Sequence, residues 1–381
     1  MLISVAMPTY KRLPQLKRST EIDSVRFLCN VMVVVIHAWP CMYVSAQDAE
    51  YRIWNFICAD FAQSILPTLF LVSGFLFFSG FDMNQFADKI KKRFGRLIVP
   101  LIAWNLVFVA LYLLVGMVSA RAYARVKEFE LTSLDGILFK VLPFVSHPID
   151  APMWFVQALL ALSMIAPLFW IAYKVGKWLG LALAVVVVIL ATHGMVPGVY
   201  VKWLPTYAII CFAVGGYVAM TGSHVAFLFA RCRVGWIAMG ILAMLSRSFA
   251  RSFCDWGGGG LFNDFTFVLM APFLLSMAPF IDRMFRNEFS RRLLLPTGFF
   301  VFASHIFFNS VFMHTIGVFC LKHQIGHPYG FLTIVALSTQ CFVLFCSVAL
   351  WHLLNHTVPG VLAVLDGRCG DKRWPRKRNV N

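Results

Sequence analysis

Long apolar runs dominate this chain of 381 residues. A helix needs about 20 consecutive apolar residues to cross the hydrocarbon core of a bilayer. The runs are continuous rather than alternating, which excludes a membrane barrel. The sequence therefore predicts an all-α, polytopic membrane protein with about ten transmembrane helices, near residues 25–43, 54–81, 97–118, 153–173, 178–196, 203–221, 234–250, 261–281, 294–320 and 329–356.

Positive charge gathers at alternate ends of these runs. If the N-terminus lies in the cytoplasm, 24 of the 33 Lys and Arg residues fall on the cytoplasmic side. The positive-inside rule therefore predicts that both termini are cytoplasmic. Contact with anionic headgroups accounts for the formal net charge of +16, so nucleic acid is not an expected partner. The longest outer connection, residues 119–152, is predicted to form a short amphipathic element or a cap over an outer cavity.

Three segments follow from this pattern. Residues 1–24 form a predicted cytoplasmic N-terminal segment, residues 25–358 the transmembrane domain, and residues 359–381 a basic cytoplasmic tail. The first apolar run is expected to remain as a signal anchor, because no cleavage-site pattern accompanies it. The ten cysteines show no metal-ligand spacing, so no metal is expected, and a pairing of Cys41 with Cys254 stays open.

Two ionisable residues interrupt the first apolar run, VRFLCNVMVVVIHAWP. Arg26 and His37 are eleven residues apart, which places them on one helix face with roughly 16 Å between them along the axis. Arg26 then lies at the cytoplasmic boundary and His37 beyond the middle of the membrane. Such residues normally face a protein interior or a water-filled cavity. A snorkelling arginine and a hydrogen-bonded core histidine would explain the pair as well.

A second basic pair opens the third run, in KIKKRFGRLIVP. Arg93 and Arg96 are three residues apart and share a helix face. The guanidinium fork suits phosphate oxygens, so a basic cytoplasmic mouth here would suit an anionic, nucleotide-bearing acyl carrier. The other interpretation is a positive-inside flank.

Several motifs, in this order, resemble the integral-membrane acyltransferases of the acyltransferase-3 family, which modify surface glycans in bacteria. EIDSVRFLCNVMVVVIHAW resembles the first helix of the family, with an Arg, ten residues and a His. The further resemblances are LPTLFLVSGFLFF to the second helix, KKRFGRLIVPLIAWN to the third, APMWFVQALL to the fourth and GFFVFASHIFF to a late helix. The resemblance covers nearly the whole chain. One departure is that ASHIFF lacks the Tyr-Leu pair usual before its histidine.

The resemblance implies a membrane-embedded O-acyltransferase. It would move an acyl group, most often acetyl, from acyl-coenzyme A to a hydroxyl of a cell-surface or lipid-linked glycan. His37 matches the general base, and Arg26, Arg93 and Arg96 match residues that hold the acyl-coenzyme A. Neutral imidazole suits proton transfer near pH 7. The expected location is the bacterial inner membrane, with lipid and glycan as partners, no metal, and homo-oligomerisation left open.

Asp60 lies outside the family pattern. The hairpin between the first two runs has its midpoint near residue 48, so His37 and Asp60 are predicted at similar depth in antiparallel neighbours. Asp60 is therefore a candidate to orient His37, the alternative being a carboxylate facing water at the outer interface.

Four further residues are candidates for binding substrate. Membrane-belt anchoring explains Trp154 equally well, and Ser73 together with Gly74 would allow close helix packing. Ser73 as a nucleophile is a further interpretation. The four candidates are Ser73, Trp154, Gln157 and His305.

A function without chemistry is the alternative from a different class. The chain would then be a transporter or exporter of a glycan or an acylated intermediate, since intramembrane His and Arg also mark transport pathways. Arginines fit both functions. The histidine deep in the first run favours the enzyme, because a carrier has no need of a base at that depth.

Overall fold

Helices make up all the regular structure that is described. The computed structural model describes residues 20–38, 49–117, 124, 126–192, 204–222, 229, 232–253, 261–322 and 330–368, and these residues contain no strand. The longer helices are α1 (Thr20–His37), α4 (Pro67–Phe78), α5 (Phe86–Gly116), α8 (Trp154–Thr192), α9 (Thr206–Met220), α11 (Arg233–Phe253), α12 (Leu261–Ser276), α15 (Gly298–Lys322) and α16 (Phe331–Thr357). The shorter elements are α2 (Ala49–Asn55), the π-helix η2 (Phe56–Ala62), α3 (Gln63–Ile65), η3 (Met83–Gln85), α7 (Leu134–Val141), η4 (Ala151–Met153), α13 (Ala278–Met284), α14 (Glu288–Leu293), η5 (Leu295–Thr297) and α17 (Pro359–Leu365).

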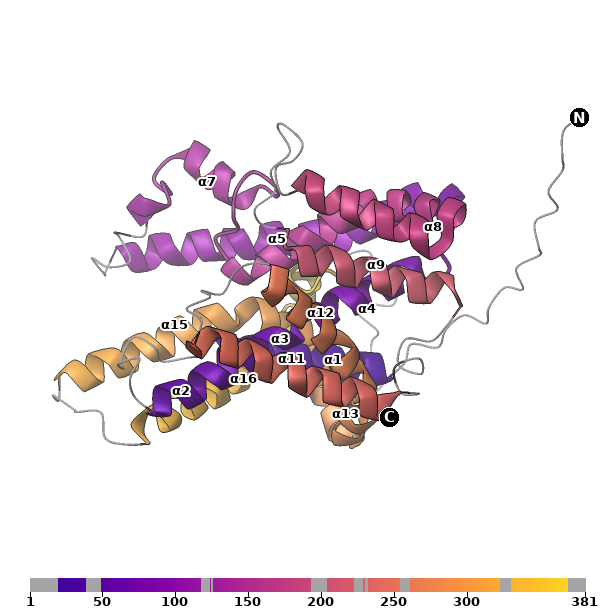
Figure 1. Cartoon of the computed structure of the whole chain (residues 1–381). Helices are drawn as coiled ribbons and strands as arrows, with labels where there is room; N and C mark the ends of the chain where they lie inside the picture. The colour runs from indigo at the N-terminus through magenta and orange to yellow at the C-terminus, as the bar shows by residue number, and fades with distance from the viewer. Residues whose placement is uncertain are drawn as a thin grey trace, which may run out of the picture.

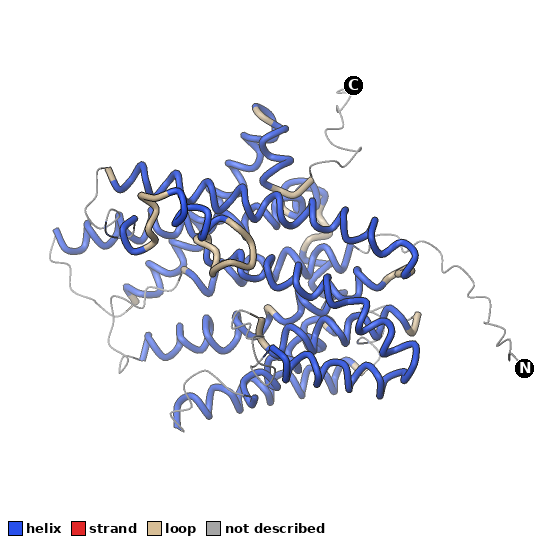
Figure 2. The backbone as a smooth tube through the Cα atoms, turned by 90° about the horizontal axis from the view of Figure 1, so that it is seen from above, coloured by secondary structure: helices blue, strands red, loops and turns tan. Residues whose placement is uncertain are grey.

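The predicted apolar runs all contain helix. Most of the long helices follow a common direction in the two perpendicular views (Figures 1 and 2). Five helices in the described residues are long and apolar enough to cross a membrane, and a sixth span is formed if α12 and α13, bent by 58°, count as one. The five are Ala49–Phe78, Met83–Gly116, Ala151–Thr192, Glu288–Ile316 and Phe331–Thr357. The chain is therefore an all-α membrane protein.

One of these five helices is a hairpin. Lys177 interrupts α8 with φ 53° and ψ −136°, far from helical values. A Cβ atom added to Gly180 would clash with the carbonyl oxygen of Ala172, eight residues earlier. In a straight helix those residues would lie about 12 Å apart along the axis. The chain therefore folds back at Lys177, which agrees with the two separate runs that the sequence predicts in this region.

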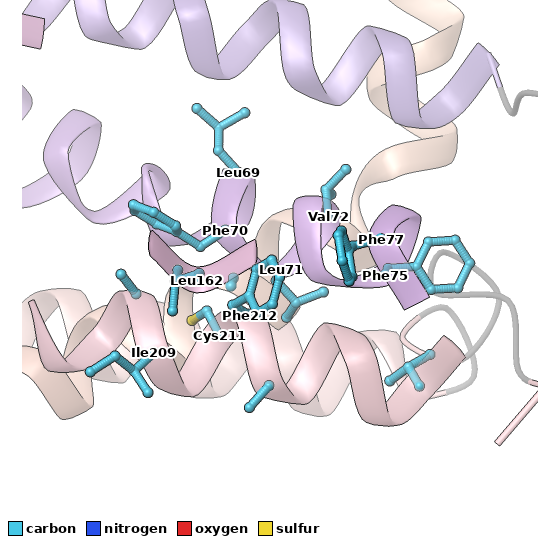
Figure 3. Packing of buried hydrophobic residues seen from close by; sticks show 14 of the residues in the cluster. Leu69, Phe70, Leu71, Val72, Phe75, Phe77, Leu162, Ile209, Cys211 and Phe212 are labelled. Atoms are coloured by element: carbon cyan, nitrogen blue, oxygen red, sulfur yellow. The ribbon is translucent and has the colours of Figure 1, made fainter. Parts of the chain in front are cut away.

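The tightest helix pair in the core joins α4 to α9. A Cβ atom on Gly74 would overlap the carbonyl of Phe212, and one on Gly215 would overlap the carbonyl of Leu71. Small residues that let backbones touch are the usual basis of helix packing in membranes. Figure 3 shows Leu71 and Phe212 meeting between these helices. The predicted close packing at Gly74 is confirmed.

We expect Gly74→Ala to destabilise the protein, because neither backbone can retreat without disturbing the buried side chains around it. Overpacking of this kind costs about 1–3 kcal/mol. The measurement is the midpoint of thermal unfolding in detergent. Gly95→Ala on α5 is the matched control, since an added Cβ there meets nothing within 4 Å. Equal midpoints for the two variants would contradict this account of the α4–α9 contact.

Candidate functional site

His37 is the last residue of α1, and its ring lies against a second histidine. The ring centroids of His37 and His305 are 5.1 Å apart, with 43° between the ring planes. His305 comes from α15 and is fully buried, whereas His37 is only partly buried. The structure thus brings together two histidines that the sequence separates by more than 260 residues, and His37 is the more accessible of the two.

The ring of His305 is held by its own helix. Its Nδ1 lies 2.6 Å from the carbonyl oxygen of Phe302. Its Nε2 is buried and has no hydrogen-bond partner among the described residues. The side chain therefore has one nitrogen fixed and the other available.

Asn309 fixes the backbone of the same site. Its Nδ2 donates a hydrogen bond of 2.6 Å to the carbonyl oxygen of His37, which is one of the carbonyls at the end of α1 that lack a helical partner. Asn309 lies one turn after His305, so α15 contacts both the ring and the main chain of His37. Sequence reasoning missed Asn309, although a His and an Asn four residues apart in an apolar run were a usable signal.

A basic cluster lies at the other end of the Arg26–His37 face. Arg26 approaches Asp23 at 3.9 Å and is close enough to Arg93 for their charges to interact. The guanidinium of Arg93 lies 5.0 Å from the ring centroid of Phe77, and Lys89 Nζ lies 5.3 Å from the same ring. Arg26, Arg93 and Lys89 therefore lie near one another.

Arg96 has a different setting from Arg93. Arg96 is exposed, and its backbone carbonyl is in contact with Gly367, just after α17. Trp104 Nε1 of α5 donates to the carbonyl of Leu365 at 3.1 Å. Residues 359–368, which the sequence assigns to a tail, are thus packed against α5.

The segment after α17 is closed by an ion pair. Asp366 Oδ2 accepts a hydrogen bond of 2.8 Å from Trp351 Nε1 and forms an ion pair with Arg368 at 3.1 Å. Arg368 also donates to the carbonyl of Pro296 at 2.6 Å. Burial raises the pKa of Asp366 to about 6, outweighing the opposite effects of Arg368 and Trp351. The remaining residues of the predicted tail lie outside the described residues.

Asp60 pairs with an arginine that sequence reasoning missed. It lies in the π-helix η2, and its Oδ1 is 3.7 Å from Arg247 Nε, with both side chains buried. Arg247 also donates to Ser64 Oγ at 3.0 Å and lies 4.0 Å from the ring centroid of Phe267. In the described residues no hydrogen bond or ion pair joins Asp60 to His37. The role of Asp60 in orienting His37 therefore stays a prediction.

The other candidates from sequence lie on α4 and in the first turn of α8. Ser73 is half-buried on α4. The Trp154 ring centroid lies 6.1 Å from that of Phe70. Gln157 is buried and donates from Nε2 to the carbonyl of Ser146 at 3.3 Å. The link from this region to α15 is a ring contact, because the Phe155 and Phe302 centroids are 5.8 Å apart.

A buried carboxyl group immediately precedes the fourth predicted span. Asp150 is fully buried, and its backbone N–H donates to Asn105 Oδ1 at 3.2 Å. Neither carboxyl oxygen has a hydrogen-bond partner in the described part of the chain. Burial raises the pKa of Asp150 well above its usual range.

We expect the contribution of Asp150 to stability to fall as pH rises above about 4. Its folded-state pKa is raised, so its contribution is intact below the unfolded value of 3.8 and is lost as pH rises towards the folded value. Asp150→Asn should remove this part of the pH dependence and raise the unfolding midpoint by about 3 °C near pH 8. The measurement is thermal unfolding in detergent across the pH range.

Asp135→Asn on α7 is the control for this experiment, because that carboxylate is exposed on the same outer connection. If Asp150→Asn keeps the pH slope of the wild type, the buried carboxyl is not the cause.

Comparison with known proteins now gives the class of this chain. A family model described as an acyltransferase domain, that of the acyltransferase-3 family, matches residues 19–277, which is more than half of the chain. The chain belongs to this family. It is therefore a membrane acyltransferase, and the matched segment contains Arg26, His37 and the Arg93–Arg96 pair. No curated protein and no solved structure matches the chain.

Proposed function

We propose that the protein transfers an acyl group, in the commonest case acetyl, from acyl-coenzyme A to a hydroxyl of a cell-surface or lipid-linked glycan. The observation that carries this proposal is the placement of Arg26 and His37 on one helix. At one end of α1, Arg26 joins Arg93 and Lys89 in a basic cluster. At the other end, the imidazole of His37 is partly accessible beside His305.

The basic cluster is suited to the phosphates of the donor. Arg93 is partly buried, and its Nε atom is buried without a hydrogen-bond partner in the described residues. Phosphate oxygens are strong acceptors for such a group. The eleven-residue rise along α1 then sets a distance of roughly 16 Å over which the acyl arm reaches His37.

His37 acts as the general base in this proposal. Its ring nitrogen takes the proton of the acceptor hydroxyl as the oxygen attacks the thioester carbonyl. The new C–O bond forms, the C–S bond breaks, and the imidazolium passes the proton to the leaving thiolate. No metal takes part in this scheme.

The proposed setting is the inner membrane of a bacterium, with ten spans and both termini in the cytoplasm. Basic residues on one side support this orientation. The turn at Lys177 supports it further, because Lys174 and Lys177 lie at or beside the fold-back of α8, on the side assigned to the cytoplasm.

His37→Ala should abolish acylation of the acceptor, because no other described side chain has an accessible imidazole at this site. The measurement is mass spectrometry of cell-surface glycans from cells without the gene, complemented with wild type or His37→Ala. The enzyme function predicts acyl groups only with wild type. Identical glycans in every strain would count against the enzyme and in favour of a transporter or another acceptor class.

Arg93→Gln should raise the KM for acetyl-coenzyme A by about tenfold, the value of one charge-assisted hydrogen bond. Arg96→Gln should have a smaller effect, since Arg96 is exposed and Arg93 lies beside Arg26. The measurement is acyl transfer in membranes at varied donor concentration. Lys91→Gln and Lys92→Gln are controls, because both residues are exposed on the same helix. If all four variants change KM equally, general positive charge is responsible and not a built site.

A further inference from the structure

The tautomer of His305 follows from its hydrogen bond. A backbone carbonyl only accepts hydrogen bonds, so the Nδ1 that lies 2.6 Å from the Phe302 oxygen carries the proton. In the neutral ring, Nε2 then has the lone pair. This nitrogen is buried and without a partner in the described residues, which is a costly arrangement for a group that serves only packing.

The nearest ring to this lone pair belongs to His37, at 5.1 Å between centroids. Ring nitrogens lie roughly 1.2 Å from the centre of an imidazole, so two nitrogens that face each other at this separation would be about 2.7 Å apart. The rings are tilted and form no hydrogen bond in the structure as it stands. Catalytic hydrogen bonds commonly tighten only when substrate is bound, and in this proposal a rotation of the His37 side chain forms the bond.

We propose that His305 is the positioning residue of His37, accepting a hydrogen bond from one His37 nitrogen at its own Nε2 so that the other His37 nitrogen faces the acceptor hydroxyl. This rests on the proposed function of His37 as a base. It gives His305 a role other than contact with substrate, and Asn309 supports it by holding the backbone of His37.

The proton balance of the step is simple. The hydroxyl proton moves to the free nitrogen of His37, which becomes an imidazolium, and its other N–H stays bonded to His305 Nε2. That hydrogen bond becomes charge-assisted and therefore stronger in the transition state. The thiolate then takes this proton from the His37 imidazolium, and His305 stays neutral throughout.

A neutral partner suits this environment. In serine hydrolases a carboxylate fixes the tautomer of the catalytic histidine, but an unpaired carboxylate is expensive inside a membrane. Here the carboxylate of Asp60 is engaged by Arg247. The ring of His305, itself fixed by the Phe302 carbonyl, supplies the acceptor without adding a charge.

The test compares His305→Phe, which removes the acceptor, with His305→Gln, whose side-chain oxygen can still accept a hydrogen bond. The readout is the rate at which diethyl pyrocarbonate modifies His37 in the full chain in lipid nanodiscs, followed by mass spectrometry. This rate reports the nucleophilicity of His37 and needs neither donor nor acceptor. Ser304→Ala is the control, because Ser304 is buried on the same turn but bonds to Ser347 at 2.9 Å.

We expect His305→Phe to slow modification of His37 severalfold, and His305→Gln and Ser304→Ala to leave it close to wild type. Equal rates in His305→Phe and wild type would overturn the proposal. If the variants do not fold, nitrogen-15 spectra of the wild-type histidines decide instead. A His305 ring protonated at Nε2 rather than Nδ1 would also overturn it.

Acylation of cell-surface glycans by the same variants separates this inference from the proposed function. We expect His305→Phe to lower acylation by about tenfold with the KM for acetyl-coenzyme A unchanged. If wild type itself acylates no glycan, the proposed function fails while the modification rates still test the histidine pair.

Discussion

The contact between the end of α1 and the middle of α15 is the constraint on which the site depends. A helix that ends inside a membrane protein leaves carbonyl groups without partners, and no water is at hand in the hydrocarbon region to satisfy them. Asn309 satisfies the carbonyl of His37, and that same hydrogen bond fixes where the His37 ring begins. The cost of leaving this carbonyl without a helical partner is thus offset by the helix that also supplies His305.

Because α1 is a regular helix, it keeps the basic cluster and the histidine pair at a set distance. Another face of α1 packs on η2, where Cys58 Sγ donates to the carbonyl of Val35 at 3.4 Å. The π-helix geometry of η2 in turn places Asp60 towards Arg247 of α11. Irregular helix in a membrane is tolerated where neighbouring side chains satisfy it, and here that irregularity fastens α11 to the rest of the bundle.

The sequence predicts an all-α membrane fold, because lipid leaves a chain few other ways to satisfy its backbone. Each of the ten predicted apolar runs contains helix, two of them are the arms of the hairpin inside α8, and five or six helices in the described residues are long and apolar enough to span. The Arg26–His37 face follows from the helical period. Partners across the bundle do not follow, since an apolar run gives no sign of which face meets which neighbour. For this reason Asn309, Arg247 and Asp150 were missed.

The segment after α16 contacts both α5 and the residues just before α15. Gly367 sits against the backbone of Arg96 on α5, and Arg368 reaches the carbonyl of Pro296 at the start of α15. The helix that carries Arg93 and Arg96 and the helix that carries His305 are therefore both held by this short segment. Any sliding of α15 against α5 has to move this segment as well or break its hydrogen bonds, so the described C-terminal residues couple the movements of the two helices.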